Sequence, residues 1–199
     1  MSGFIIMDKP TGWTSHDVVA KMRGVLKERK IGHLGTLDPL ATGVLVLAVG
    51  RDATKQISQF MKLDKEYEAT MELGKVSDTY DTEGKVESLL IGDVNEAKIL
   101  EVMETFWGET SQMPPAFSAK KIAGKKAYEL ARAGLPVVLK PVMVKMRGLD
   151  ISVQMPIVKF KVEVSSGTYI RSLVHDSGQK LGWGAVLTAL RRTRVGDFK

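Results

Sequence analysis

Residues 65–73, KEYEATMEL, alternate strictly between hydrophobic and polar positions. Tyr67 and Met71 fall on one face with the other apolar side chains, and the glutamates fall on the opposite face. A period of two residues is typical of a strand with one buried face. Residues 142–146 and 158–164 alternate in the same way, so the pattern predicts three half-buried strands.

Residues 3–7 predict a short buried strand, and the continuous apolar run at 43–50 predicts a second buried strand. Residues 111–121 have the composition of an extended loop, and 190–196 that of a basic edge. Helical periodicity or capping signals predict five helices. One begins at the Asp93–Glu96 capping box and runs to about residue 106, and the others lie at 16–26, at 53–63, at 126–134 and within 165–182. Strands outnumber helices and do not alternate with them, so the predicted class is α+β, with a mixed, mostly antiparallel sheet flanked by helices.

The chain of 199 residues has no linker, repeat or low-complexity tract, so we predict a single domain over residues 1–199. No apolar run approaches the roughly 18 residues of a membrane span, and the N-terminus lacks a basic-then-apolar secretory signature. We expect a cytoplasmic protein that does not associate with membranes.

Cysteine is absent, which excludes disulfides, thiolate metal ligands and cysteine nucleophiles. His16, His33 and His175 lack the spacing of a zinc site. The chain also contains no phosphate-binding loop and no dinucleotide fingerprint. We therefore expect neither a metal nor a cofactor.

The formal net charge is +6, which favours a polyanionic partner such as RNA or DNA. The alternative is a mildly basic enzyme whose charges only keep it soluble. A basic segment flanked by Phe117 and Tyr128 predicts phosphate contacts, unless it is only a solvated face; its cations are Lys120, Lys121, Lys125, Lys126 and Arg132. The same two readings apply to Arg191, Arg192 and Arg194.

The stretch GHLGTLDPLATGVL, residues 32–45, contains one carboxylate, Asp38, in a glycine-rich loop before a buried strand. Asp followed by Pro is a common helix start, so Asp38 could simply be an N-cap. The glycines instead favour a sharply turned backbone that approaches a ligand closely. A loop anchored by a buried strand is also where a scaffold commonly presents a reactive group.

Arg171 falls in the first turn of a predicted helix, where a cation opposes the helix dipole. This misfit indicates a tertiary partner such as a buried carboxylate, and Asp38 is one candidate. The alternative is a surface arginine. Tyr67 lies on the apolar face of its strand, so it is either a core residue or a ring that stacks on a base.

Five motifs, in order from about Phe4 to Gly196, resemble those of the bacterial tRNA pseudouridine synthases of the TruB family. They are IIMDKPTGWTSHDVV, GHLGTLDPLATGVL, KEYEATMELGKVSDTYDTEG, QMPPAFSAKKIAGKKAYELARAG, and VSSGTYIRSLVHDSGQKLGWGA with LRRTRVG. The resemblance implies the pseudouridine synthase catalytic fold with an RNA-contacting insertion at about 105–140. It also implies isomerisation of uridine 55 in the TΨC stem-loop of tRNA, without cofactor or metal.

The resemblance implies a role for each matching residue. Asp38 is the catalytic aspartate and Arg171 is its partner, while Tyr67 stacks against the target base. His33 holds the flipped-out RNA conformation, and Lys9 supports the loop or the nearby RNA backbone. Two further residues line the base pocket, Tyr169 and Leu190.

Family members usually continue into a small RNA-binding PUA module, and we expect none within these 199 residues. We expect a monomer that needs no obligatory protein partner. Two alternatives to a self-sufficient enzyme are an RNA-binding or RNA-chaperone domain that keeps the fold without catalysis, and a catalytic domain that works only with partner proteins, as in the archaeal and eukaryotic guide-RNA enzymes.

Overall fold

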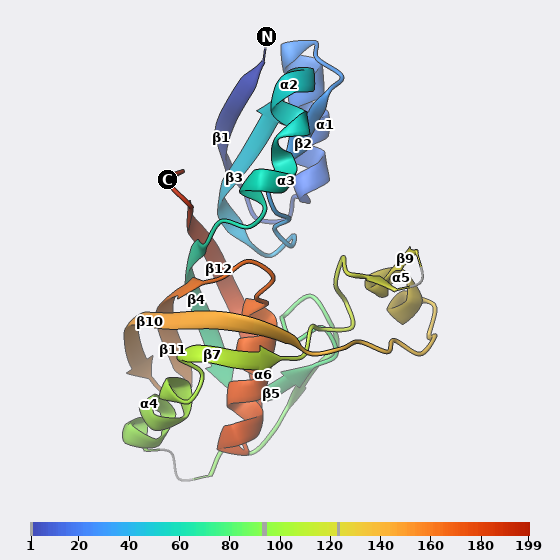
Figure 1. Ribbon diagram of the computed structural model, residues 1–199. Helices are drawn as coiled ribbons and strands as arrows, with labels where there is room; N and C mark the ends of the chain where they lie inside the picture. The colour runs from blue at the N-terminus through green and yellow to red at the C-terminus, as the bar shows by residue number, and fades with distance from the viewer. Residues whose placement is uncertain (1, 93–94, 123) are drawn as a thin grey trace. The chain divides into compact units, whose positions relative to one another are not determined.

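The computed structural model describes residues 2–92, 95–122 and 124–199, and its chain forms two compact units (Figure 1). The first unit comprises Met1–Ala69, Lys161–Ser166 and Ala189–Lys199. The second comprises Thr70–Phe160 and Gly167–Thr188. Three strands contribute residues to both units: β4 (Lys65–Leu73), β11 (Ile157–Val164) and β12 (Ala185–Val195).

The first unit is built around β3 (Thr42–Val49), whose apolar run is almost completely buried. Strand β1 (Gly3–Lys9) pairs antiparallel with β3 from Gly3↔Val49 to Lys9↔Gly43, and β2 (Ile31–His33) pairs antiparallel with it as well. Strand β12 runs parallel to β3 at Arg192↔Gly43. The helices are α1 (Ser15–Leu26), α2 (Gly50–Lys55) and α3 (Ile57–Phe60).

The second unit contains helix α4 (Glu96–Glu104) and helix α6 (Ile170–Leu181). Strand β7 (Gly108–Gln112) pairs antiparallel with β10 (Val142–Gln154). The small elements are β5 (Lys75–Ser77) paired with β6 (Val86–Ser88), β8 (Lys121–Ile122) paired with β9 (Lys125–Lys126), and α5 (Ala127–Arg132). The connection from β7 to β10 carries β9 and α5 at the far end of a long excursion (Figure 1).

The main sheet has the strand order β1-β3-β12-β4-β11-β10-β7, with β2 added at β3. Antiparallel pairs predominate around the one parallel pairing described above, which confirms the predicted α+β class with a mixed, mostly antiparallel sheet. No helix in the described part of the chain is both long and apolar enough to cross a bilayer.

Several predicted elements differ from the structure in extent. The helix predicted at 53–63 is broken at Gln56, whose amide bonds to Ala53 O at 3.0 Å in a tighter turn. Strand β10 extends beyond the predicted 142–146 to Gln154, and the predicted loop at 111–121 begins within β7. Asp93 lies outside the described residues; α4 begins at Glu96, and Asn95 is its N-cap, with a side chain that accepts from Ala97 N at 2.8 Å.

The segment predicted as a basic edge, 190–196, lies largely within strand β12, between β3 and β4 in the sheet. That prediction was wrong because the charged run LRRTRV hides an alternation: Arg192 is 1% exposed, whereas Arg191 is exposed. A strand places neighbouring side chains on opposite faces, so consecutive arginines have opposite environments here.

Candidate active site

Asp38 lies in the first unit, in a turn between β2 and β3, and its side chain is half-buried. No helix follows it in this described stretch, because the chain turns through a bond from Ala41 N to Asp38 O at 3.0 Å and enters β3 at Thr42. The N-cap interpretation of Asp38 is therefore wrong. The carboxylate instead sits in a loop that is held by buried polar groups on several sides.

The ammonium group of Lys9 holds one side of this loop. Lys9 is 0% exposed, at the end of β1, and its Nζ donates to Pro10 O at 2.9 Å, Trp13 O at 2.5 Å and Pro39 O at 3.3 Å. Gly12 N also donates to Pro39 O at 2.9 Å. A buried ammonium must satisfy its donors within the protein, so Lys9 fixes the residue that follows Asp38. This geometry favours loop support among the two roles predicted for Lys9.

The hydroxyl of Ser15 holds the residue that precedes Asp38. Ser15 is buried at the start of α1; its Oγ accepts from Leu37 N at 2.8 Å and donates to Leu37 O at 3.1 Å. Leu34 N donates to Val46 O at 2.9 Å and anchors the beginning of the loop to β3. The backbone on both sides of Asp38 is therefore fixed by hydrogen bonds rather than left free.

The third anchor is Arg192, which the basic-edge prediction had assigned to a solvent-exposed surface. Its Nε donates to Val44 O at 2.8 Å, its Nη2 to Gly35 O at 3.1 Å and its Nη1 to Thr36 O at 3.4 Å. Glycine is required at position 43 beside it: φ is +98°, and a Cβ there would lie 2.2 Å from Arg192 O. The guanidinium of Arg192 thus holds the start of the loop, at Gly35 and Thr36, against Val44 at the beginning of β3.

Burial and nearby positive charge disfavour the protonated forms of two residues in the loop region, Lys65 and His33. Lys65 is 7% exposed, and burial together with the charge of Arg192 lowers its pKa to about 8. Its Nζ donates to Met61 O at 2.9 Å and to Leu63 O at 2.5 Å. Burial, followed by the charges of Arg192 and His16, also lowers the pKa of His33. His33 is therefore kept neutral more readily than a free histidine.

Two other predicted site residues of the first unit are buried side chains. Tyr67 is 8% exposed on the inner face of β4, which confirms that it faces the core side of its strand. Leu190 is also 8% exposed, on β12, and its carbonyl accepts from Thr42 Oγ1 at 3.4 Å. Their roles towards a nucleobase stay predictions.

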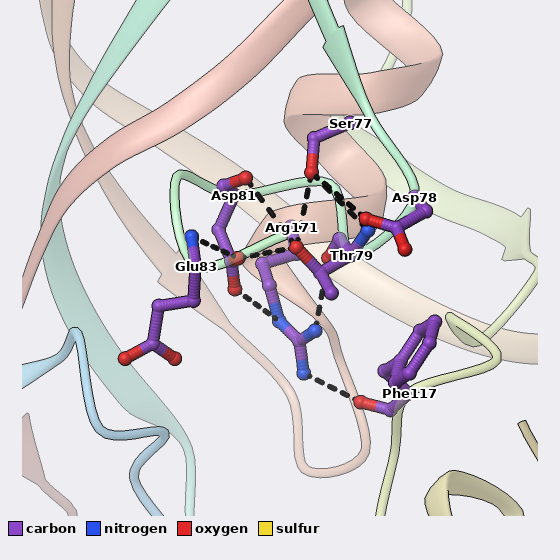
Figure 2. Close-up of polar contacts among 7 residues, drawn as sticks. All are labelled: Ser77, Asp78, Thr79, Asp81, Glu83, Phe117 and Arg171. Atoms are coloured by element: carbon purple, nitrogen blue, oxygen red, sulfur yellow. Dashed lines mark hydrogen bonds and ion pairs between the residues drawn. The ribbon is translucent and has the colours of Figure 1, made fainter. Parts of the chain in front are cut away.

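Arg171, in the second unit, lies in the first turn of α6 as predicted and is 5% exposed, so it is not a surface arginine. Figure 2 shows its guanidinium pointing into the turn formed by residues 77–83. Its Nη1 donates to Thr79 O at 3.0 Å, its Nη2 donates to Phe117 O at 2.9 Å, and its Nε lies 3.6 Å from Asp81 Oδ2. The predicted pairing of Arg171 with Asp38 stays a prediction.

Asp81, a partner of Arg171 that the sequence analysis missed, is 2% exposed. Its Oδ1 accepts from Thr79 Oγ1 at 2.6 Å and from Glu83 N at 3.0 Å (Figure 2). Gly84 fits closely beside this turn, since a Cβ there would lie 2.1 Å from Asp78 Oδ1. The signal in the sequence is SDTYDTEG, in which acids and threonines immediately follow an alternating strand.

Tyr169 directly precedes α6, and the side-chain amide of Gln112 fixes its backbone. Gln112 Oε1 accepts from Tyr169 N at 2.8 Å, and Gln112 Nε2 donates to Tyr169 O at 3.0 Å. Gln112 is 2% exposed at the end of β7, so this contact ties the start of α6 to the sheet. The two predicted residues of this helix start, Tyr169 and Arg171, are thus held from β7 and from the 77–83 turn.

The predicted RNA-contacting insertion overlaps the connection between β7 and β10. Most of its predicted phosphate-contacting cations are exposed. Two of them lie against one aromatic ring, since Lys126 Nζ and Arg132 Cζ are each 5.4 Å from the Tyr128 centroid. Lys121 and Lys126 pair across the β8–β9 hairpin. The exposure and the clustered cations support the phosphate-contacting interpretation, which stays a prediction.

Within residues 2–92, 95–122 and 124–199, no three His, Asp or Glu side chains are grouped so that they could hold a metal ion. The chemistry available at the candidate site is that of a fixed carboxylate, buried cations and aromatic rings.

Comparison with known families identifies a match over residues 23–170 to the model described as TruB family pseudouridylate synthase, N-terminal domain. The tRNA pseudouridine synthase B of Opitutus terrae is 45% identical over 202 residues, which cover 100% of this chain and 83% of that protein. The protein of the same name from Protochlamydia amoebophila is 47% identical over 200 residues, which cover 100% of this chain and 76% of that protein.

Two solved structures resemble the chain over nearly its whole length. One is the crystal structure of a Cbf5-Nop10-Gar1 complex, with a TM-score of 0.73, 38% identity and coverage of 99% of this chain and 50% of that one. The other is an H/ACA RNP bound to a substrate RNA containing 2'-deoxyuridine, with a TM-score of 0.70, 36% identity and coverage of 99% and 48%. The chain therefore spans about half the length of these structural relatives.

Proposed function

Because the chain belongs to the TruB family of pseudouridylate synthases, we propose that it converts uridine 55 in the TΨC arm of tRNA into pseudouridine, with Asp38 as the catalytic carboxylate. The observation that carries this proposal is the anchoring of the Asp38 loop by Lys9, Ser15 and Arg192. Fixing a reacting group in advance removes an entropic part of the barrier. A carboxylate that served only solubility would not need three buried anchors.

The reaction rearranges one nucleotide without net change in composition. The bond between N1 and C1′ breaks, the uracil rotates, C5 bonds to C1′, and the proton of C5 leaves while N1 gains one. A stacked base cannot rotate, so the nucleotide must leave the helix for a closed pocket. Asp38 acts on the freed nucleotide either as a nucleophile or as a base on the sugar.

Three aromatic and aliphatic side chains are assigned to the pocket. Tyr67 stacks on the uracil, and Leu190 and Tyr169 line the space around it. His33, which its environment keeps neutral more readily, supports the flipped-out conformation of the RNA as a hydrogen-bonding group rather than as a cation.

Arg171 acts on the catalytic carboxylate in this proposal. An ion pair with Asp38 would favour the ionised carboxylate and fix its orientation. Asp81 and the carbonyl of Thr79 support this role, because they hold the guanidinium in one position before RNA arrives.

The basic segment is proposed to contact the phosphates of the RNA. Lys121, Lys125, Lys126 and Arg132 are exposed on one small hairpin-and-helix module, as a phosphate-binding surface requires. Binding through such contacts weakens as salt rises.

The enzyme is proposed to be a cytoplasmic monomer in one catalytic domain, without an obligatory protein partner. The relatives named tRNA pseudouridine synthase B are 45–47% identical to the chain. The likeness to a Cbf5-Nop10-Gar1 complex favours the alternative of a partner-dependent enzyme, but at the lower identity of 38%.

The test is tritium release from tRNA transcript that carries 5-³H-uridine, measured for the parent chain, Asp38→Asn and Asp64→Asn. Asp64 is an exposed aspartate of the same unit and serves as the matched control. We expect release by the parent and by Asp64→Asn and none by folded Asp38→Asn. Substantial turnover by folded Asp38→Asn would refute the assignment of Asp38, and silence of the parent while it binds tRNA would indicate a binding module or a partner-dependent enzyme.

A further inference from the structure

Trp13 is a large aromatic residue that stays exposed beside the Asp38 loop, and the proposed reaction does not use it. Its exposed fraction is 37%, whereas that of Trp183 is 9%. Burying an aromatic side chain is strongly favourable, so the fold leaves a potential contact unused at this position.

The backbone of Trp13 is fixed to the Asp38 loop by a group already described. Lys9 Nζ donates both to Trp13 O and to Pro39 O, at 2.5 Å and 3.3 Å. Gly12 N donates to Pro39 O at 2.9 Å. The backbone of Trp13 is therefore held together with the residue that follows Asp38, and the indole is attached next to the Asp38 loop.

A cation accompanies the exposed ring. Lys21 Nζ, on α1, lies 5.4 Å from the ring centroid of Trp13, and Lys21 is itself exposed. The neighbouring acid, Asp17, is engaged by the helix cap: its Oδ2 accepts from Thr14 N at 2.8 Å and from Thr14 Oγ1 at 2.7 Å. An aromatic face beside an exposed cation suits a nucleotide, whose base stacks on the ring while its phosphate meets the charge.

We propose that Trp13 and Lys21 form a stacking platform for an unpaired nucleobase of the RNA substrate that neighbours the target uridine. This inference rests on the proposed function, since a uridine that leaves the helix leaves its neighbours with an unstacked face. A ring attached beside the Asp38 loop restores that stacking and so offsets part of the cost of flipping. Stacking on one aromatic side chain is worth a factor of about 5 to 150 in affinity.

Tryptophan fluorescence tests the platform directly. In the Trp107→Phe/Trp183→Phe chain, Trp13 is the single tryptophan and reports base stacking as quenching. Titration with an RNA hairpin of the TΨC stem-loop sequence should give saturable quenching. If the RNA binds but the fluorescence of Trp13 is not quenched, the proposal is overturned.

Substitutions separate stacking from folding. Trp13→Leu should weaken RNA affinity and raise KM by about 5- to 150-fold, with kcat at saturating RNA and the melting temperature unchanged. Trp13→Phe keeps a stacking ring and should retain most of the affinity. Lys21→Gln should weaken binding and reduce the salt slope by about 1. Val25→Ala removes another exposed apolar side chain of α1, 63% exposed, and should change nothing.

The two proposals fail in different ways. If the parent releases tritium and Trp13→Leu binds RNA as well as the parent, the platform is refuted and the proposed function stands. If the parent releases none, the proposed function fails, while quenching of Trp13 with loss of affinity in Trp13→Leu still supports a base-stacking platform.

Discussion

The turn at residues 34–41 and the turn at residues 77–83 are both held by a buried arginine, but the two arginines are compensated differently. Arg192 donates to the carbonyl oxygens of Gly35, Thr36 and Val44, and within the described residues it meets no carboxylate. Arg171 donates to two carbonyl oxygens and also lies beside the buried carboxylate of Asp81.

At the 34–41 turn the described partners of the buried arginine, Arg192, carry no negative charge. At the 77–83 turn the buried arginine, Arg171, is neutralised by the carboxylate of Asp81. Arg192 and Lys65 lie under the Asp38 loop, with only carbonyl oxygens as their described hydrogen-bond partners. Burial first, and then the charge of Arg192, lower the pKa of Lys65. Such a loop favours an anion, either a carboxylate in place or an approaching phosphate. The 77–83 turn balances Arg171 with Asp81, and this contact holds both the turn and the guanidinium in one position.

The largest expected effect comes from breaking the compensated pair. Arg171→Met leaves the Asp81 carboxylate buried without its cation, so we expect the free energy of unfolding to fall by about 3–5 kcal/mol. Urea unfolding followed by circular dichroism measures it, with exposed Arg132→Met as the matched control.

The double variant Arg171→Met/Asp81→Leu shows whether charge compensation is the cause. With no uncompensated charge left, it should recover a large part of the loss. If the loss of unfolding free energy in the double variant equals the sum of the losses in the two single variants, the pairing of Arg171 with Asp81 is contradicted.

A smaller loss of stability is expected from a substitution at Arg192, because its described partners are carbonyl oxygens and no buried carboxylate loses its cation. Arg192→Met removes the hydrogen bonds to the loop carbonyls of Gly35 and Thr36 and to the strand carbonyl of Val44, so we expect a loss of about 3 kcal/mol in the free energy of unfolding. Loosening of the Asp38 loop should also lower kcat for tritium release by about 10- to 100-fold.

Its neighbour on the strand provides the control. Arg191 forms an exposed ion pair with Asp8 at 2.8 Å, so Arg191→Met should cost less than about 1 kcal/mol and leave kcat unchanged. Equal effects at the two positions would show that the hydrogen bonds of Arg192 do not fix the loop.

The smallest effect is a pH dependence from Lys65. Its pKa is about 8 in the folded chain and near 10.5 when unfolded, so the unfolded chain holds more protons between these values. The stability of the parent relative to Lys65→Met should therefore rise by about 2 kcal/mol as pH increases from about 8 to 10.5. Thermal melting of both chains across this range measures the difference, and a constant difference would contradict a lowered pKa of Lys65 in the folded chain.

Local patterns predicted the elements whose burial follows a simple period. The alternation at residues 65–73 matches β4 from Lys65 to Leu73, and α1 begins one residue before the predicted start at residue 16. The distal half of β10 was missed because the alternation slips at Leu149 and Asp150, which are both exposed, before it resumes with half-buried Ile151 and Val153. There, pairing with a neighbouring strand decides the structure rather than the pattern.

The candidate site was predictable where a residue type is unusual in its place, and not where a distant partner decides. Asp38 was recognisable as a lone carboxylate in a glycine-rich loop. Arg171 was recognisable because a cation in the first turn of a helix opposes the helix dipole. Asp81 was not, because its partner lies about ninety residues away in the sequence. Arg192 was misassigned for the same reason: 148 residues separate it from Val44, and local sequence carries no record of that contact.

This long separation also sets an order of events during synthesis. The Asp38 loop leaves the ribosome early, but the arginine that anchors it is added 148 residues after Val44, roughly 7 to 30 seconds later at ordinary rates of translation. Until then the nascent chain carries its reactive carboxylate on an incompletely anchored loop. A chain that has not yet reached Arg192 is thus expected to be less active than the complete chain.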